Sequence, residues 1–238
     1  MIILKTSEKG VLRTKIMIKV IPAIIPNSKE QLEEEINKVA KFANLVQIDI
    51  SDGIFTPTKT WPYNGRDTEF FEKLKTQEVS WPDWENVEFE IHLMIKFPEE
   101  IVLDWINTGV SAVVAHIEAT DNFQKIIDIC LKHDVKIGVA IKPSTDISRL
   151  EPFVKQVDFI QVMGSDMLGR HGEILNSKAV EQIKRLHKLY PERIIAIDIG
   201  VNTETKNTLV SAGVTKFISG GTILNADDPK EVFRNLQS

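Results

Sequence analysis

The chain alternates between short apolar runs and longer amphipathic segments. The apolar runs that predict strands lie at residues 19–25, 45–50, 87–94, 112–116, 136–141, 159–163, 194–197 and 216–219. Several of them are hydrophobic at consecutive positions, which is typical of parallel strands that are covered on both faces. The pattern therefore predicts eight buried parallel strands.

Amphipathic segments with helical spacing follow the strands. The first begins after Ser28 and ends near residue 42, and the others lie at 66–75, 98–107, 122–133, 147–155, 177–190, 203–212 and 229–236. Ser28 and Gln31 form a capping-box pattern, and Asn202 is placed to cap the helix at 203–212. Strands and helices are thus expected to alternate along the whole chain.

This alternation predicts an α/β fold of the (β/α)₈ TIM-barrel type. Units of about 25–30 residues fill residues 17–238, which we expect to form one barrel domain. The competing fold is a doubly wound open sheet, which typically has a glycine-rich turn after its first strand, but residues 26–28 contain no glycine. Residues 1–16 are expected to form a loose N-terminal extension.

Composition and charge narrow the class of protein. Hydrophobic residues make up 42% of the 238 residues and charged residues 26%, which is ordinary for a globular protein. A net charge of -5 without a basic stripe argues against nucleic-acid binding, and no apolar run is long enough to span a membrane. The single cysteine, Cys130, cannot form an intrachain disulfide, so we expect a cytoplasmic protein.

Polar residues stand at the ends of three predicted strands: Asp49, His92 and Asp198. In a parallel barrel these strand ends open on one face, where active sites lie. Gln47 is on the same side of its strand as Asp49. Because buried carboxylates are costly unless they bind a cation or exchange protons, the four residues predict a metal-assisted proton-transfer site. Taken singly, each residue also has a purely structural interpretation.

Glycines follow the last strands. Gly220 and Gly221 come after the eighth predicted strand, and Gly200 comes after the seventh. Barrels often bind phosphate in these loops, where glycine lets the backbone approach an anion closely. The loop from Gly169 to Gly172 is either a cover over that phosphate, with Arg170 as an anion partner, or a solvated turn.

From about residue 19 to residue 233 the sequence resembles the ribulose-phosphate 3-epimerase family. The family motif His-x-Asp-x-Met-Asp-Gly is similar to residues 47–53, and Asp-x-His-Leu-Met is similar to residues 90–94. Asp-Gly-Gly-x-Asn is similar to residues 198–202. The family's Gly-Phe-Gly-Gly loop is similar to residues 169–172, and its closing Gly-Ser pair is similar to Gly220-Gly221.

The resemblance implies an isomerase that interconverts D-ribulose 5-phosphate and D-xylulose 5-phosphate, as in the pentose phosphate pathway. Asp49 and Asp198 would exchange protons on opposite faces of the substrate. One divalent metal ion (Zn, Fe, Mn or Co), bound by Asp49, His92 and Asp198, would stabilise the enediolate. Met94, Met163 and the five glycines Gly169, Gly172, Gly200, Gly220 and Gly221 would contact the sugar phosphate. We also expect a homo-oligomer.

The sequence departs from the family pattern at several site positions. Gln47 stands where the family has a histidine ligand, and an amide oxygen suits hard cations better than zinc. Ala23 replaces a serine, Ser51 a methionine, Lys142 an asparagine and Ile199 a glycine. Two alternatives therefore stay open: a related barrel epimerase or lyase that acts on another sugar phosphate, and a sugar-phosphate-binding barrel without catalysis.

Overall fold

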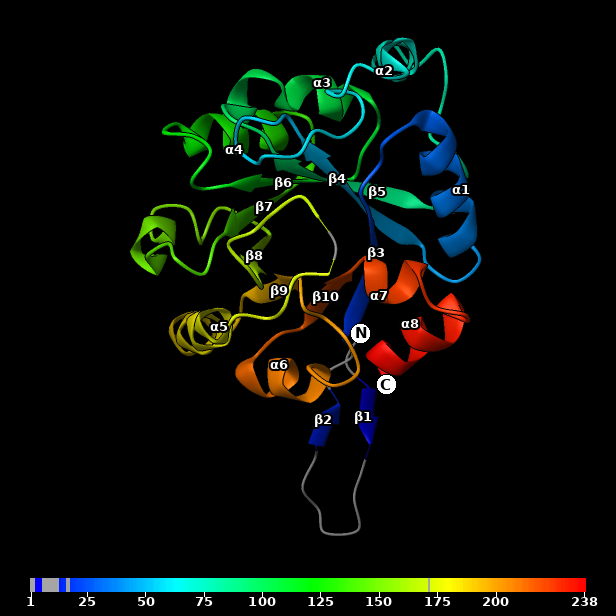
Figure 1. Cartoon of the computed structure of the whole chain (residues 1–238). Helices are drawn as coiled ribbons and strands as arrows, with labels where there is room; N and C mark the ends of the chain where they lie inside the picture. Colours follow the sequence, from blue (N-terminus) through cyan, green and yellow to red (C-terminus); the bar gives the residue numbers. More distant parts are fainter. Residues whose placement is uncertain (1–2, 6–12, 16–17, 171) are drawn as a thin grey trace.

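Eight parallel strands close into a barrel in the order β10-β3-β4-β5-β6-β7-β8-β9, with the helices outside the ring (Figure 1). The computed structural model describes residues 3–5, 13–15, 18–170 and 172–238. The barrel strands are β3 (Lys19–Ile24), β4 (Leu45–Ser51), β5 (Glu88–Met94), β6 (Ala112–His116), β7 (Lys136–Ile141), β8 (Phe159–Met163), β9 (Ile194–Asp198) and β10 (Lys216–Ser219). The predicted (β/α)₈ barrel is confirmed.

The helices that follow the strands differ from the predicted ones mainly at their ends. They are α1 (Lys29–Val39), α2 (Thr68–Lys75), η1 (Pro98–Glu100), α3 (Val102–Asn107), α4 (Phe123–Lys132), η2 (Ile147–Leu150), α5 (Ser177–Leu189), α6 (Lys206–Ala212), α7 (Gly221–Leu224) and α8 (Pro229–Gln237). Within the described ranges, no helix has both the length and the apolar character needed to cross a lipid bilayer.

Two helix predictions were wrong in extent, and local chemistry explains both. The segment expected to be helical over 147–155 forms only the 3₁₀ helix η2, because Pro152 lacks the N–H that would continue the helical hydrogen bonds. The helix expected at 203–212 begins at Lys206. The Asn202 side chain accepts hydrogen bonds from the N–H groups of Glu204 and Thr205, so it caps a turn ahead of the helix.

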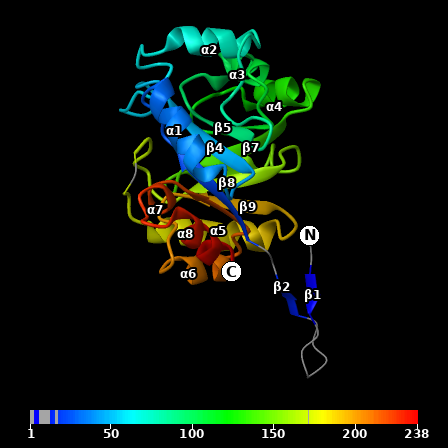
Figure 2. The ribbon, with the colours of Figure 1, turned by 90° about the vertical axis from the view of Figure 1, so that its right-hand side faces the viewer.

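The N-terminal strands β1 (Ile3–Lys5) and β2 (Arg13–Lys15) pair antiparallel as a separate two-stranded sheet. Figures 1 and 2 show these two strands projecting from the barrel. Residues 1–2, 6–12 and 16 of the expected extension, and residue 17 of the predicted domain, lie outside the described residues. That residues 17–238 form a domain independent of this extension stays a prediction.

Side-chain alternation along each strand separates an outer core from the barrel interior. On β4, Val46, Ile48 and Ile50 belong to the large apolar cluster that includes the helix side chains. Gln47 and Asp49, on the opposite face, point into the barrel. The same alternation places the polar side chains of β5 and β9 inside, so the strand register determines which residues meet there.

The lower half of the barrel interior is filled. Ile21, Ala23, Leu45 and Ile218 form one buried cluster, and Val114, Ala140, Phe159 and Ala196 form another. Between them, Lys216 Nζ lies 2.9 and 2.7 Å from the two carboxylate oxygens of Glu90 and 3.5 Å from the centroid of the Phe159 ring. Glu90, Lys216 and Phe159 thus form a floor below the predicted site, which faces the C-terminal end of the barrel.

Candidate metal and acid–base site

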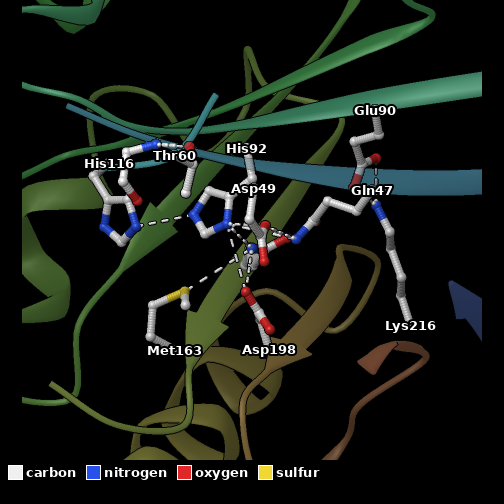
Figure 3. Close-up of polar contacts among 11 residues, drawn as sticks. Gln47, Asp49, Thr60, Glu90, His92, His116, Met163, Asp198 and Lys216 are labelled. Atoms are coloured by element: carbon white, nitrogen blue, oxygen red, sulfur yellow. Dashed lines mark hydrogen bonds and ion pairs between the residues drawn. The ribbon is translucent and has the colours of Figure 1, made fainter. Parts of the chain in front are cut away.

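The strand register brings four of the predicted site residues together above this floor (Figure 3). Asp49 on β4 lies directly opposite His92 on the neighbouring strand β5. Gln47 is one inward position below Asp49 and faces the same space. Asp198 is the last residue of β9. All four side chains are buried, with at most 7% of any residue exposed.

His92 Nδ1 lies between the two aspartates. It is 3.1 Å from Asp49 Oδ1 and 3.5 Å from Asp198 Oδ2, and one ligand atom from each of the three residues lies within 4.8 Å of the others. Ligand bonds of about 2.0–2.2 Å place neighbouring donor atoms roughly 3–4 Å apart around one cation. The three side chains therefore fit a single divalent ion.

The electrostatics of the site also favour a cation. Burial, and then the negative charge of Asp49, raise the pKa of the Asp198 carboxyl well above its usual range. Burial alone lowers the pKa of His92, but the hydrogen bond to Asp49 and the charges of Asp49 and Asp198 outweigh it and raise that pKa. Two carboxylates held this closely need a shared proton or a cation to offset their repulsion.

A buried relay continues from the far side of the His92 ring. His92 Nε2 is 3.0 Å from His116 Nε2, and His116 Nδ1 is 3.1 Å from Glu118 Oε2. Glu118 Oε1 accepts the backbone N–H of Lys142 at 2.8 Å. Because a carboxylate can only accept, His116 Nδ1 carries the proton and His116 Nε2 accepts one from His92. By the same rule, His92 Nδ1 donates a proton to the Asp49 carboxylate, and a cation bound by these residues would take the place of that proton.

The pKa values of the relay agree with this proton arrangement. Burial lowers the pKa of His116 to about 4, which keeps the ring neutral. Burial alone would raise the pKa of Glu118, but the hydrogen bond to His116 outweighs it and the pKa falls to about 2. Neither residue was among the predicted site residues. A histidine at the end of the strand at 112–116, followed two residues later by a carboxylate, was the signal that could have identified them.

Gln161 is a further polar residue that sequence reasoning missed. It is fully buried on β8, and its Nε2 lies 3.4 Å from Asp198 Oδ2 and 3.5 Å from His92 Nδ1. Phe159 and Met163, two positions away on either side, are also inward-facing. An amide at the middle inward position of an apolar strand was the available signal.

A cavity of about 710 Å³ opens above the site. Asp49 and Asp198 lie in its wall, whereas Gln47 and His92 lie beneath it. The wall also contains every residue predicted to contact the substrate: Met94, Met163, Gly169, Gly172, Gly200, Gly220 and Gly221. A small molecule in this cavity can therefore reach both carboxylates.

The rim of the cavity contains two features of its own. Arg170 Nε pairs with Glu173 at 2.7 Å, and the neighbouring His171 lies outside the described residues. Ile199 lines the cavity with a φ of 80°, a left-handed conformation that is an outlier for a β-branched residue. Such backbone strain costs on the order of 1–3 kcal/mol. The strained residue, Ile199, directly follows the site residue Asp198.

The chain is similar to known proteins over most of its length. The ribulose-phosphate 3-epimerase of Schizosaccharomyces pombe is 25% identical over 224 residues, covering 94% of both chains. That of Bacillus subtilis is 25% identical over 227 residues, covering 93% of this chain and 99% of the relative. The 3-hexulose-6-phosphate synthase structure from Salmonella typhimurium has the same fold, with a TM-score of 0.67 and 15% identity over 92% of this chain and 97% of the other. Residues 19–224 match the Ribulose-phosphate 3 epimerase family, and the chain belongs to it.

Proposed function

We propose that this protein interconverts D-ribulose 5-phosphate and D-xylulose 5-phosphate by proton transfer at the carbon next to the ketone. The observation that carries the proposal is the placement of Asp49 and Asp198, which reach one cavity from different strands with oxygens within 4.8 Å of each other. Each oxygen can then lie about 3 Å from a single carbon held between them.

The two carboxyl groups suit opposite roles in this reaction. Burial and the charge of Asp49 raise the pKa of the Asp198 carboxyl, so it holds a proton more readily than an ordinary carboxyl and suits the role of acid. Asp49 accepts the C3 proton from one face of ribulose 5-phosphate, and Asp198 donates a proton to the other face. After this step Asp49 carries a proton and Asp198 is ionised. The two residues therefore exchange roles in the reverse reaction, which starts from xylulose 5-phosphate.

A divalent cation held by Asp49, His92 and Asp198 would supply positive charge beside the ketone oxygen and so acidify the C3 proton. The relay through His116 and Glu118 holds the proton of His92 on Nε2, so His92 Nδ1 would give up its own proton and offer its lone pair to that cation. The glycines at the cavity rim, among them Gly220 and Gly221 at the start of α7, leave room for the substrate phosphate to approach the backbone.

The proposal is tested with purified protein, ribulose 5-phosphate and a coupled assay for xylulose 5-phosphate, with each of several divalent metals added. Loss of an acid–base group typically lowers the rate by about 10²–10⁴-fold. We expect Asp49→Asn and Asp198→Asn each to show at least the lower end of this loss while keeping the fold. Substantial epimerisation by either variant would contradict the two-base assignment.

A related sugar phosphate is the second candidate substrate, and the shape of the site favours testing it. A second cavity of about 450 Å³ adjoins the first and shares Ile25, Gly169, Arg170 and Asn225 with it. This space gives room for a ketose phosphate longer than a pentose. A substrate panel decides between the two, because faster turnover of a six-carbon ketose phosphate would replace the first proposal. Ligand binding without exchange of the C3 proton for deuterium would instead indicate a barrel that binds without catalysis.

A further inference from the structure

Two buried amide groups point at the three residues that fit a cation. Gln47 Nε2 on β4 lies 2.8 Å from Asp49 Oδ1 and 3.5 Å from His92 Nδ1. Gln161 Nε2 on β8 lies 3.4 Å from Asp198 Oδ2 and 3.5 Å from the same His92 nitrogen. Both glutamines are fully buried. The ends of both side chains therefore border the space between the aspartates and the imidazole.

The oxygens of these amides have no hydrogen-bond partner. Among the described residues, Gln47 Oε1 and Gln161 Oε1 are buried acceptors without a donor. An unsatisfied buried acceptor typically costs about 1–3 kcal/mol, so two of them beside one site call for an explanation. Rotation of an amide by 180° exchanges its oxygen and nitrogen with almost no change in shape. A cation at the site would attract the oxygens and repel the NH₂ groups.

The spacing of the donor atoms agrees with such a rotation. The terminal amide atoms, the carboxylate oxygens and His92 Nδ1 are separated by 2.8–3.5 Å along the contacts given above. Ligands bound at about 2.0–2.2 Å in an octahedral arrangement are about 3 Å from their neighbours. With both amides rotated, four oxygens and one nitrogen surround the same space.

We propose that Gln161, together with Gln47, binds the cation of this site through its amide oxygen and makes it a site for hard cations such as Mn²⁺. The inference rests on the metal site of the proposed function and names two residues of this chain as its additional ligands. Amide and carboxylate oxygens suit Mn²⁺ and Mg²⁺, whereas zinc prefers nitrogen and sulfur in four-coordinate sites. Gln161 thus provides an oxygen ligand close to the one that Gln47 offers in place of a histidine.

The test measures Mn²⁺ and Zn²⁺ dissociation constants of the metal-free protein by competition with a chelator. Gln161→Leu removes the oxygen, and Gln161→Glu is the matched variant that keeps one. We expect Gln161→Leu to weaken Mn²⁺ binding at least about tenfold and Zn²⁺ binding much less, and Gln161→Glu to bind Mn²⁺ at least as tightly as wild type. Gln161→Met keeps the side-chain length and replaces the leucine variant if that one does not fold.

Three results would overturn the inference. They are an unchanged Mn²⁺ affinity in Gln161→Leu, an equal loss of affinity for Mn²⁺ and Zn²⁺ in that variant, and no Mn²⁺ binding by the wild-type protein. The equal loss would indicate that Gln161 only supports the packing of the site. The measurement needs no substrate. A protein that binds Mn²⁺ as expected but lacks epimerase activity would therefore refute the proposed function and leave the ligand assignment standing.

Discussion

The ion pair in the barrel floor gives a sharp stability prediction. Lys216 and Glu90 are joined at 2.7 Å, and their side chains are only 6% and 2% exposed. Lys216→Met keeps the length and apolar part of the lysine and leaves Glu90 buried beside Phe159 without its cation. Removing one partner of a buried pair typically costs about 3–5 kcal/mol, because the remaining charge has no compensation.

A second estimate of the stability lost in Lys216→Met gives a similar value. The variant can avoid a buried charge by taking up a proton, and for an ordinary glutamate at pH 7 this costs about 3.7 kcal/mol. We therefore expect Lys216→Met to lose about 3–4 kcal/mol, a large share of the roughly 5–15 kcal/mol that stabilises a typical domain. For a chain of this length the loss lowers Tm by about 6–16 °C. The deficit should shrink at pH 5, where proton uptake costs less.

The assay is urea unfolding followed by tryptophan fluorescence and circular dichroism, because Trp61, Trp81 and Trp105 are buried. The control is the double variant Glu90→Leu/Lys216→Met, in which both charges are replaced by apolar groups of similar size. Such replacements are often neutral or stabilising, so the double variant should recover most of the loss. A single variant within about 1 kcal/mol of wild type, or a double variant as unstable as the single one, would refute the reasoning.

Two further predictions concern other buried groups. His116→Leu should weaken divalent-metal binding about 10–100-fold, as is typical when a partner of a metal-binding histidine is lost. His116→Gln keeps an acceptor for His92 and should lose less affinity. If chelator competition gave equal metal affinities for wild type and His116→Leu, the relay would be contradicted. Burial, aided by the charge of Asp158, raises the pKa of the Cys130 thiol to about 12, so almost no thiolate forms at pH 8. A thiol-specific reagent should modify Cys130 only after urea is added, and rapid modification of the native protein would show that the residue is accessible.

The barrel could be predicted from the sequence because its strands are short apolar runs between clear helical segments. Strands 112–116, 136–141, 159–163 and 216–219 were predicted at the bounds that the structure shows. Helix ends were harder, since they depend on single side chains. Pro152 shortens one helix, and Asn202 uses its side chain to form a turn before another.

The site was predictable where residues stand at the ends of parallel strands, because a closed barrel brings those ends together whatever its detailed register. This placed Asp49, His92 and Asp198. Gln161 and His116 were missed because their strands are mostly apolar on both faces, and the pattern alone does not say which residues point inward. The metal identity, the cytoplasmic location and the homo-oligomer stay predictions.

The closed floor of the barrel has a consequence for how hydrogen atoms travel. Glu90, Lys216 and Phe159 are each at most 5% exposed, so these floor residues separate the acid pair from bulk water on the side opposite the mouth that the sugar enters. While a sugar fills that mouth, a hydrogen taken from it can return to the sugar, leave when the sugar departs, or pass along the chain from His92 through His116 to Glu118. The buried floor residues therefore limit the paths by which the acid pair can exchange protons with solvent.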